Sequence, residues 1–401
     1  MSRTLPRFDF RIEFAGVTDI GLVRKVNEDA LLASPECALF GIADGMGGHA
    51  GGEVAARVAL EASQRALMRP EVAEMLDGYV ADPSLDRRRG LFSLLRGAGE
   101  AANQAVLDEA SRSGELSGMG ATLDLALLVR NRAFIAHVGD SRVYLIRPTA
   151  MLQLTQDHLL HEARSGGPAG VSRRVSAPLV NAIGMRPTVV CDTLFVDLVR
   201  GDRLLLCTDG VHGAMESESA LARLCAKGTP VEIGRLLLAQ ARQEGGRDNA
   251  SAIVIEIRDR FVKRPADAGL LARDLTALES CALLTGLPPA AVLAALAAGV
   301  EVEVTVGEKI PRKVTNDLVT YIVIDGLVEL ADGRRLGPPG LLFAESLVAV
   351  HQERLLPTVI SPHARLIRIR HDDFSEVCRQ DPQLAARLYK RLARYLASLS
   401  A

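Results

Sequence analysis

The pattern of apolar and polar residues along this chain changes near residue 260. Before that point, apolar runs are separated by short turns rich in Asp and Gly, which is typical of buried strands. Residues 52–68 and 91–112 repeat their apolar positions at helical spacing, so we expect a helix in each. Strands, then helices, then further strands predict an α+β domain built in layers. The clearest predicted strands read ALFGIADG, TLDLALLVR, AFIAHVGD, DRLLLCTDG and ASAIVIEIR.

After residue 260 the pattern predicts a linker and a second domain. The charged stretch FVKRPADAG (261–269) contains Pro and Gly, as linkers often do. A helix over about 271–298 is expected next, followed by short alternating strands and an amphipathic helix at 381–399. We therefore predict domains at 1–260 and 276–401, joined by a linker at 261–275.

Composition narrows the class of protein. The 401 residues, 48% hydrophobic and 24% charged, suffice for two globular domains. A net charge of −2, few aromatic residues and no Trp argue against a nucleic-acid-binding surface. The most apolar stretch, 283–300, is too short for a membrane span and contains Pro288 and Pro289. With no signal-peptide pattern and six scattered cysteines that suit a reducing compartment, we expect a cytoplasmic protein without membrane contact.

Aspartates stand at the ends of predicted strands, and this placement suggests chemistry. Asp44, Asp140 and Asp209 follow apolar runs, whereas Asp29 and Asp248 precede them. Any single one is explained by the preference of Asp for turns. Several carboxylates converging at sheet ends would repel one another unless cations neutralised them, and such oxygen ligands suit Mg²⁺ or Mn²⁺. Two such ions can activate a water molecule and hold a phosphoryl group for in-line attack.

Eight stretches, in order along the chain, resemble motifs of the metal-dependent Ser/Thr protein phosphatases of type 2C (the PPM family) in their bacterial form. The resemblance covers about residues 10–258 and implies a four-layer α-β-β-α sandwich. It also implies an enzyme that uses Mn²⁺ or Mg²⁺, with two core ions and a third, weaker site. The matching stretches are VRKVNEDA (23–30), GIADGMGGHAGGEVAA (41–56), SGMGATL (117–123), AHVGDSRVYLIR (136–147), QLTQDH (153–158), NAIGM (181–185), GDRLLLCTDGVHGAM (201–215) and GGRDNASAIVI (245–255).

The resemblance assigns the core metal ligands residue by residue. Asp44 matches the carboxylate that bridges the two core metals, and the Gly45 carbonyl matches a ligand of the second metal. Asp209 and Asp248 match ligands of the first metal. By this resemblance, Asp44 and Asp209 are the acids on which catalysis is expected to depend.

Residues around this core are matched as well. Glu28 matches a second-metal ligand that acts through water, and Asp29 is its neighbour just outside the coordination sphere. Asp140, in the GDSR motif, matches the acid of the third metal site, which it shares with Asp209. Asn249 directly follows a core ligand, as in the family, and is expected to orient the site.

The mechanism that the resemblance implies is direct hydrolysis of phosphoserine or phosphothreonine by a water that two metals activate, without a phosphoenzyme. Arg24 matches the arginine that grips the substrate phosphate, a task for which a planar guanidinium is suited. The donor of the leaving-group proton stays open. Eukaryotic members have a His where this chain has Met46, and either His49 or metal-bound water would serve. His158, in QLTQDH, is interpreted as structural.

One segment departs from the family pattern. Family members carry a flap after the QLTQDH motif, and here residues 159–180 are rich in Gly and Pro and shorter than the usual bacterial flap. Arg164, Arg173 and Arg174 would make this segment basic. It is either a solvated loop or a mobile rim that attracts acidic phosphopeptides.

The second domain resembles the cyclic-nucleotide-binding domain, a β-roll with flanking helices, but its ligand motif is altered. Glu345 stands where the ribose-binding Glu of that family is expected, while Ala344 replaces the preceding Gly. Arg354 lies at one spacing used for the phosphate-binding Arg, whereas another count puts Leu355 there. These changes disturb the backbone approach and the anion contact. A degenerate module is therefore the preferred interpretation, and nucleotide binding through Glu345 and Arg354 is the alternative.

The functional prediction is a Mn²⁺- or Mg²⁺-dependent protein serine/threonine phosphatase with a C-terminal regulatory module. The alternative is a cyclic-nucleotide-responsive receptor or docking module in which the phosphatase domain is weakly active. The expected partners are a phosphoprotein substrate and, by family analogy, a bacterial Ser/Thr kinase or its targets. A homodimer paired through the C-terminal helix is a further expectation.

Overall fold

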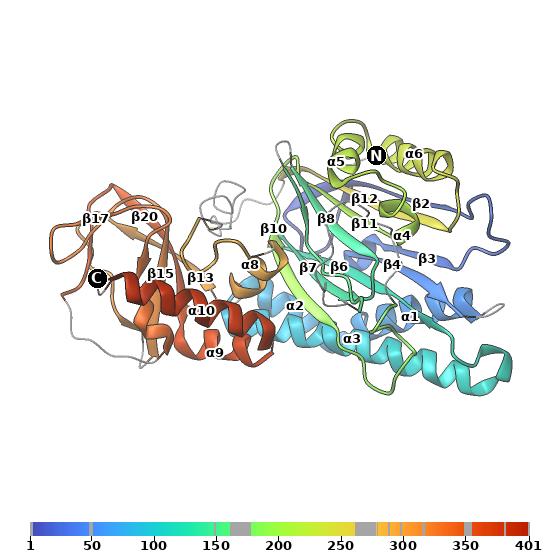
Figure 1. Ribbon diagram of the computed structural model, residues 1–401, viewed down its shortest axis with the longest axis horizontal. Helices are drawn as coiled ribbons and strands as arrows, with labels where there is room; N and C mark the ends of the chain where they lie inside the picture. Colours follow the sequence, from blue (N-terminus) through green and yellow to red (C-terminus); the bar gives the residue numbers. More distant parts are fainter. Residues whose placement is uncertain are drawn as a thin grey trace, which may run out of the picture. The chain divides into compact units, whose positions relative to one another are not determined.

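The computed structural model divides the chain into two compact units, Met1–Lys263 and Arg264–Ala401 (Figure 1). Each unit has hydrophobic clusters of its own. The predicted linker at 261–275 lies outside the described residues. The structure describes residues 3–47, 51–147, 150–160, 178–260, 278, 280–287, 289–296, 299–314, 317–348, 355–380 and 382–399.

The first unit contains two antiparallel sheets built from the predicted apolar runs. The first sheet has the strand order β1-β2-β12-β11-β8-β9, and the second has the order β10-β7-β6-β4-β3 with β5 beside β4. The strands of the first sheet are β1 (Arg3–Thr4), β2 (Phe10–Asp19), β8 (Arg142–Arg147), β9 (Ala150–Gln153), β11 (Arg203–Cys207) and β12 (Ala250–Arg260). Those of the second are β3 (Asp29–Ser34), β4 (Leu39–Met46), β5 (Gly120–Ala121), β6 (Leu123–Val129), β7 (Arg132–Val138) and β10 (Asp192–Asp197).

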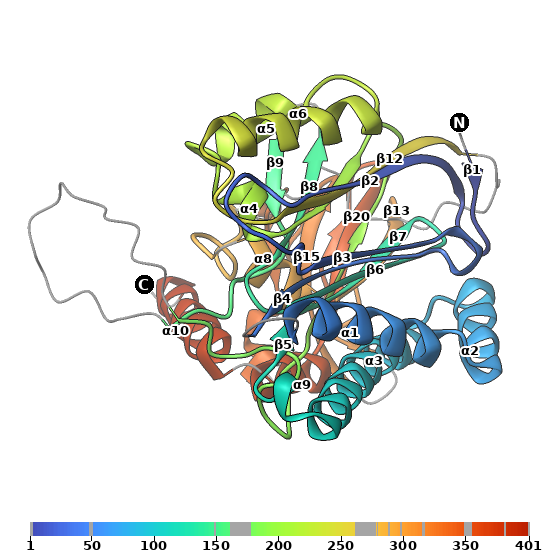
Figure 2. The ribbon, with the colours of Figure 1, turned by 90° about the vertical axis from the view of Figure 1, so that its right-hand side faces the viewer.

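The two sheets face each other, and helices lie on their outer sides (Figure 2). Phe14 of β2 and Phe40 of β4 join the sheets through an edge-on ring contact, with 5.1 Å between centroids. Helices α1 and α3 pack on the second sheet, whereas α6 packs on β2 and β12. The prediction of a mixed helix-and-sheet fold is confirmed. The helices are α1 (Gly51–Leu67), α2 (Pro70–Ala81), α3 (Leu85–Arg112), α4 (Asp209–His212), α5 (Glu218–Cys225) and α6 (Pro230–Gln243), with 3₁₀ turns η1 (Pro35–Cys37) and η2 (Gly114–Leu116).

Helix α2 is an element that the sequence pattern did not predict. Pro70 begins it, because proline fits the first turn of a helix. The helix buries Val72, Leu76 and Tyr79. The Tyr79 ring meets Phe134 of β7 edge-on, with 5.4 Å between centroids. Contacts with the sheet therefore stabilise a helix that is too short to form alone.

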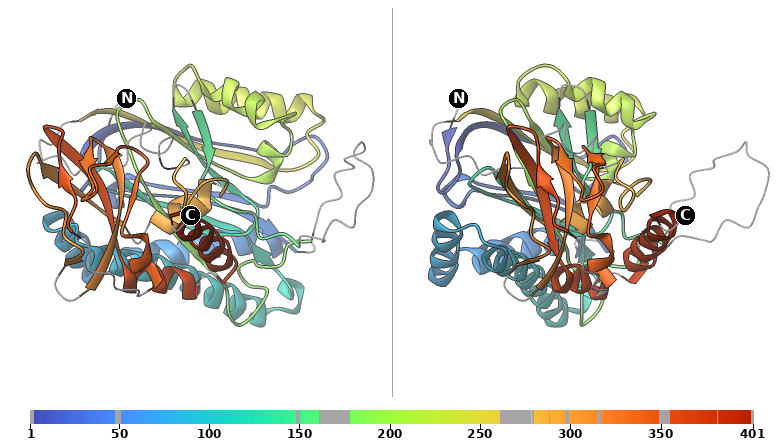
Figure 3. Two further views of the ribbon diagram at one scale, coloured as in Figure 1. Left: turned by 60° about the vertical axis from the view of Figure 1, so that its left-hand side comes forward. Right: turned by 90° about the vertical axis from the view of Figure 1, so that its left-hand side faces the viewer.

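The second unit, whose strands and helices are drawn in Figure 3, contains two hydrophobic clusters that share one sheet. Side chains alternate along a strand, so Ile322 and Ile367 join the cluster with the helices, while Tyr321 and Leu366 join the other. The sheet has the order β13-β20-β15-β14 with β18 beside β15, and a smaller sheet has the order β17-β16-β19. The strands are β13 (Gly299–Thr305), β14 (Lys313–Val314), β15 (Asp317–Asp325), β16 (Val328–Glu329), β17 (Arg335–Leu336), β18 (Leu341–Leu342), β19 (Thr358–Val359) and β20 (His363–Arg370).

The helix predicted over 271–298 is wrong in its middle part. Residues 280–286 form turns and bends, and α8 spans only Pro289–Leu296. Gly286 has a φ of +68°, a left-handed conformation that interrupts a right-handed helix. The remaining elements are η3 (Ala344–Val348), α9 (His371–Gln380) and α10 (Pro382–Leu399). Among the described residues, no helix combines the length and apolarity needed to cross a membrane.

Candidate functional site

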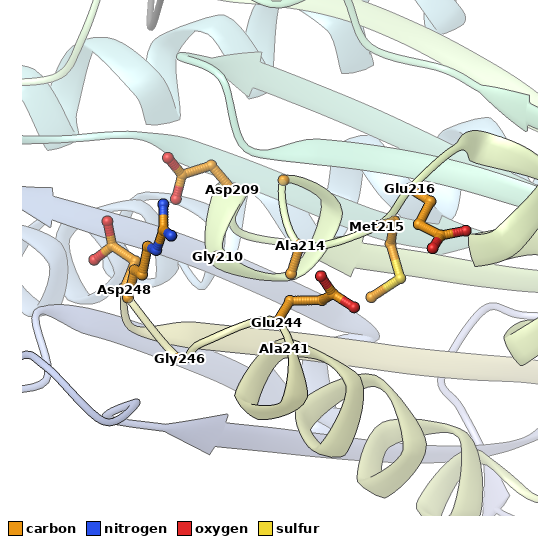
Figure 4. A pocket seen from close by; sticks show the side chains of 11 residues that line it. Asp209, Gly210, Ala214, Met215, Glu216, Ala241, Glu244, Gly246 and Asp248 are labelled. Carbon is orange, nitrogen blue, oxygen red and sulfur yellow. The ribbon is translucent and has the colours of Figure 1, made fainter. Parts of the chain in front are cut away.

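Four predicted carboxylates meet where the two sheets face each other. Asp29 of β3 lies directly opposite Asp44 of β4 in the antiparallel register. In the other sheet, Asp209 follows β11 and Asp248 precedes β12. Figure 4 shows Asp209 and Asp248 at the same end of one pocket. Because Asp44 interacts electrostatically with each of the other three, these distant positions in the sequence form one cluster.

Burial and mutual repulsion make the cluster unfavourable as a set of free anions. The pKa of Asp44 lies well above its usual value, because burial penalises the charge and Asp29 and Asp209 add repulsion. Burial also raises the pKa of Asp29 to about 7, although two hydroxyl groups donate to it. The pKa of Asp209 is raised by burial and by Asp248. A bound cation would remove this cost.

The donor set fits hard divalent cations. Every predicted side-chain ligand is a carboxylate, and one oxygen each of Asp29 and Asp209 is buried without a hydrogen-bond partner among the described residues. Buried polar atoms normally have a partner, and an ion would be one. Among the described residues, however, no group of three or more Asp, Glu, His or Cys side chains is already arranged to hold a metal ion. Ion binding therefore requires side-chain movements, which an ion favours by cancelling the repulsion.

Arg24 already neutralises part of this charge. Its Nη2 atom lies 2.9 Å from the Asp248 carboxylate, and its Nη1 atom lies 3.6 Å from that of Glu28. The Arg24 side chain is 45% exposed, so the guanidinium is on the solvent side of the cluster. The residue predicted to bind phosphate therefore lies beside the predicted metal ligands. There its guanidinium can release these carboxylates and bind an anionic substrate instead.

Asn249 is buried and fixes the loop that carries Arg24 and Glu28. Its Oδ1 atom accepts a hydrogen bond from the Glu28 N–H at 2.9 Å. Its Nδ2 group donates to the carbonyls of Ile20 and Val26, at 3.0 Å each. One amide side chain thus holds both ends of this loop, which is how it can orient the site.

Gly45 lies where β4 meets the first turn of α1. Its N–H donates to the Glu28 carbonyl at 3.0 Å. A Cβ atom at this position would lie 2.0 Å from the carbonyl oxygen of Gly52, so only glycine fits. Burial raises the pKa of Glu28, whose carboxylate accepts a hydrogen bond from the backbone of Gly52. The predicted ligands Gly45 and Glu28 are thus held together against α1.

Asp140 lies in the tight turn between β7 and β8. Burial and then the charge of Asp209 raise its pKa to about 6. The preceding Gly139 has a φ of +117°. His158 holds this turn, because its ring Nδ1 accepts from the Gly139 N–H at 3.1 Å and its backbone N–H donates to the Gly139 carbonyl at 2.8 Å. These bonds are compatible with the interpretation of His158 as a structural residue.

Three hydroxyl residues that sequence reasoning did not single out also bond to Asp29 or Asp44. Thr208 Oγ1 donates to Asp29 at 3.0 Å, and the Ser251 hydroxyl bonds the same carboxylate. Thr122 Oγ1 accepts from the Asp44 N–H at 2.9 Å. Thr208 and Ser251 stand close to predicted ligands in the motifs CTDG and DNAS, which was the only signal for them. Thr122 lies in the matched stretch SGMGATL, but that motif does not show that its hydroxyl contacts Asp44 on another strand.

A pocket of about 450 Å³ opens beside Asp209 and Asp248 (Figure 4). Its walls come from α4 and the loop after it, the end of α6 and the loop before β12. Glu216 lies at the other end from the two aspartates, with Glu244 between. A substrate chain therefore has room next to the predicted metal ligands.

In the second unit, the carboxylate predicted for nucleotide binding is already paired. Glu345 Oε1 lies 2.7 Å from Arg312 Nη2, and these side chains are only 10% and 8% exposed. The Arg312 guanidinium also lies 5.4 Å from the centre of the Phe343 ring. A pocket of about 400 Å³, lined mainly by apolar side chains, adjoins Glu345. The other predicted nucleotide contact, Arg354, lies outside the described residues.

Two further predictions fall outside the described residues: His49 and the flap positions 161–177, which include Arg164, Arg173 and Arg174. The base of the flap is described. The Leu160 N–H donates to the Pro178 carbonyl at 3.0 Å, and the Val180 N–H donates to the His158 carbonyl at 2.9 Å. The segment therefore leaves and re-enters the fold at one place.

A buried carboxylate cluster that needs divalent cations, with an arginine on its solvent side, is typical of a metal-dependent phosphatase. The family model for protein phosphatase 2C matches residues 23–232 of this chain. The serine/threonine phosphatase stp of Listeria innocua is 30% identical over 247 residues, which are 60% of this chain and 93% of that protein. The serine/threonine protein phosphatase PstP of Mycobacterium tuberculosis is 31% identical over 263 residues, 64% of this chain and 47% of that protein.

A solved structure agrees with these relatives. The catalytic domain of PstP in complex with two manganese ions has a TM-score of 0.51 and 29% identity, covering 62% of this chain and 99% of that one. The chain therefore belongs to the protein phosphatase 2C family. The family match lies within the unit Met1–Lys263, and the prediction of a metal-dependent protein phosphatase is confirmed.

Proposed function

We propose that the first unit hydrolyses phosphoserine and phosphothreonine in a phosphoprotein substrate. The observation that carries this proposal is the buried carboxylate cluster, which is unfavourable without divalent cations. Bound Mn²⁺ or Mg²⁺ would supply Lewis-acid stabilisation of the phosphoryl group and an activated water. The residues that would hold two core ions and a third are Glu28, Asp29, Asp44, Gly45, Asp140, Asp209 and Asp248.

Arg24 binds the substrate phosphate in this proposal. Its guanidinium now bonds Asp248 and Glu28. Once cations neutralise these acids, it can donate paired N–H bonds to a phosphate. Asn249 keeps the loop of Arg24 in place, so the phosphate is held in one orientation. The adjoining pocket accommodates residues that flank the phosphorylated one.

We also propose the finer architecture that the resemblances imply. The phosphatase unit is a four-layer α-β-β-α sandwich, supported by its facing sheets and outer helices. The second unit is a degenerate cyclic-nucleotide-binding-like β-roll with flanking helices that serves as a regulatory module. The buried pair Arg312–Glu345 supports the loss of nucleotide binding, because a ribose would need the carboxylate that Arg312 already neutralises.

The cellular setting follows from the family resemblance and is likewise a proposal. The enzyme acts in the cytoplasm on targets of a bacterial Ser/Thr kinase, or on the kinase itself. A homodimer through α10 is the proposed assembly. Sedimentation velocity of the full chain tests the assembly, because a monomer at micromolar concentration contradicts it.

Phosphate release from a phosphothreonine peptide tests the activity. Wild type with Mn²⁺ should turn over, EDTA should abolish turnover, and Asp209→Asn should lower kcat by at least about a thousandfold. Asp108→Asn, on the exposed face of α3, is the matched control and should behave as wild type. A folded, metal-loaded wild type without turnover would contradict the phosphatase and favour the docking-module alternative.

A further inference from the structure

The second unit contains a groove of a single charge sign that the proposed function does not use. It lies between the turn at 282–286 and α10 and has a volume of about 730 Å³. Arg387, Lys390, Arg391 and Arg394 line it. Their spacing of three, four and seven residues places all four on one face of α10. We call these four residues and the turn the basic groove.

The cations of the basic groove differ from exposed arginines of α1 and α3. In α1, Arg57 pairs with Glu61, 3.1 Å away, and exposed arginines of α3 also find acids within their helix. Helix α10 contains no Asp or Glu at 382–399. Across the described ranges, no acidic side chain pairs with Arg387, Lys390 or Arg394. The positive charge of this face is therefore left for a group outside the described fold.

Arg391 gives the groove a fixed wall. Its Nε atom donates to the Thr285 carbonyl at 2.7 Å, and its Nη1 atom donates to the Arg387 carbonyl at 3.3 Å. Gly286 lies beside the same side chain, since a Cβ at this position would be in ordinary contact with Arg391 Nη2, at 3.5 Å. The turn and the helix are thus joined through one guanidinium, and the other three cations are exposed beside it.

The position of these residues in the helix explains only part of this arrangement. Cations near the C-terminal end of a helix interact favourably with its dipole, but that effect falls off within the last turn and requires no groove. A bilayer is a poor partner, because Leu384, Leu388 and Leu392 are buried in the unit and leave no apolar face to insert. A nucleic acid is disfavoured by the scarcity of aromatic residues for stacking.

We propose that the basic groove binds an acidic segment of a protein partner, foremost of a phosphoprotein substrate. From residue 387 to 394 the helix rises about 10 Å, a length matched by about three residues of extended chain. Clustered cations of this kind attract such a segment and accelerate its association. Only the identity of the partner as substrate rests on the proposed phosphatase activity.

Binding of fluorescein-labelled octaglutamate to the full chain tests the groove directly. The variant Arg387→Gln/Lys390→Gln/Arg394→Gln should weaken binding at least about tenfold at low salt, because surface charge attraction is lost. Arg391 is left in place because it holds the turn. The charge-matched control Lys309→Gln/Lys313→Gln/Arg335→Gln, at exposed positions of the same unit, should bind as wild type. Equal binding by both triple variants would overturn the proposal.

Kinetics test whether the bound segment belongs to a substrate. A phosphothreonine peptide carrying a flexible tail of four glutamates should show a several-fold higher KM with the groove variant and an unchanged kcat. The same peptide without the tail should not distinguish the variants. An unchanged KM for the tailed peptide would overturn the substrate assignment.

Three other results separate the remaining possibilities. Faster turnover of the tailless peptide by the groove variant would show that the groove binds the chain's own phosphatase unit, and would overturn the proposal. Groove-dependent binding of duplex DNA or anionic vesicles in preference to octaglutamate would overturn it as well. Groove-dependent octaglutamate binding by a protein without phosphatase activity would support the groove while contradicting the proposed function.

Discussion

The carboxylate cluster of the phosphatase unit and Glu345 of the second unit are both predicted ligands, yet the fold balances their charges differently. Asp29 and Asp209 each keep a buried oxygen without a hydrogen-bond partner among the described residues. Glu345 instead has the Arg312 guanidinium 2.7 Å away. The first set needs a cation from outside, whereas the second is neutralised within the fold.

This difference shows how a family resemblance can be examined physically. A carboxylate that binds a ligand must be left with charge or hydrogen-bonding capacity that the protein does not satisfy itself. Asp44, whose raised pKa reflects burial and four acidic neighbours, meets that condition. Glu345 does not meet it, because a ligand that bound this carboxylate would have to break its buried ion pair with Arg312.

Asp44→Asn should produce the largest effect. Removing the central charge should lower kcat by at least about a thousandfold, since the proposed metal site would lose a ligand. The metal-free protein should nevertheless become more stable, because a buried and repelled anion is gone. Calorimetry in EDTA and phosphate release with Mn²⁺ measure the two effects. A variant less stable than metal-free wild type would contradict the account of the cluster.

Arg312→Met should break the balanced pair of the second unit. Leaving Glu345 buried and unpaired should cost about 3 kcal/mol or more of unfolding free energy, measured by urea denaturation of the full chain. The double variant Arg312→Met/Glu345→Leu is the control and should recover part of the loss. A cost below about 1 kcal/mol for the single variant would show that the pair is not buried in solution.

Asp29→Asn should gain stability relative to metal-free wild type as the pH rises. The pKa of Asp29 is about 7 in the folded chain and about 4 in an unfolded one. Protonation therefore stabilises the folded wild type fully below about pH 4, and this contribution is lost as the pH approaches 7. Between pH 5 and 7 the difference should grow by about 2 kcal/mol. Urea unfolding in EDTA measures it, and a difference that is flat with pH would refute the raised pKa.

Asn249→Ala should have the smallest effect of this series. The loop that carries Arg24 and Glu28 loses its support, so kcat/KM should fall about tenfold. Asn103→Ala is the matched control, because this buried amide also holds a loop, accepting from the Gly184 N–H at 2.7 Å. Both variants should lose similar stability. Equal losses of activity would show that Asn249 acts on the fold alone.

Much of the fold could be predicted because its elements carry local patterns. The helices α1, α3 and α10 and the strands β4, β6, β7, β11 and β12 lie where apolar spacing placed them. The errors occur where a tertiary contact or the conformation of one residue decides whether a helix forms. Helix α2 depends on the contact of Tyr79 with Phe134, and the helix expected at 271–298 is interrupted at Gly286.

By itself the sequence determined which acids this protein carries, their order, and that glycines accompany them. Only the tertiary structure decided which charges meet. Strand register places Asp29 opposite Asp44, and the fold of the chain brings Asn249 next to the loop that carries Glu28. Packing places Arg312 against Glu345. The physical reason is that repulsion, desolvation and hydrogen bonding depend on distances of a few ångströms between residues far apart in the chain, and no local pattern records those distances.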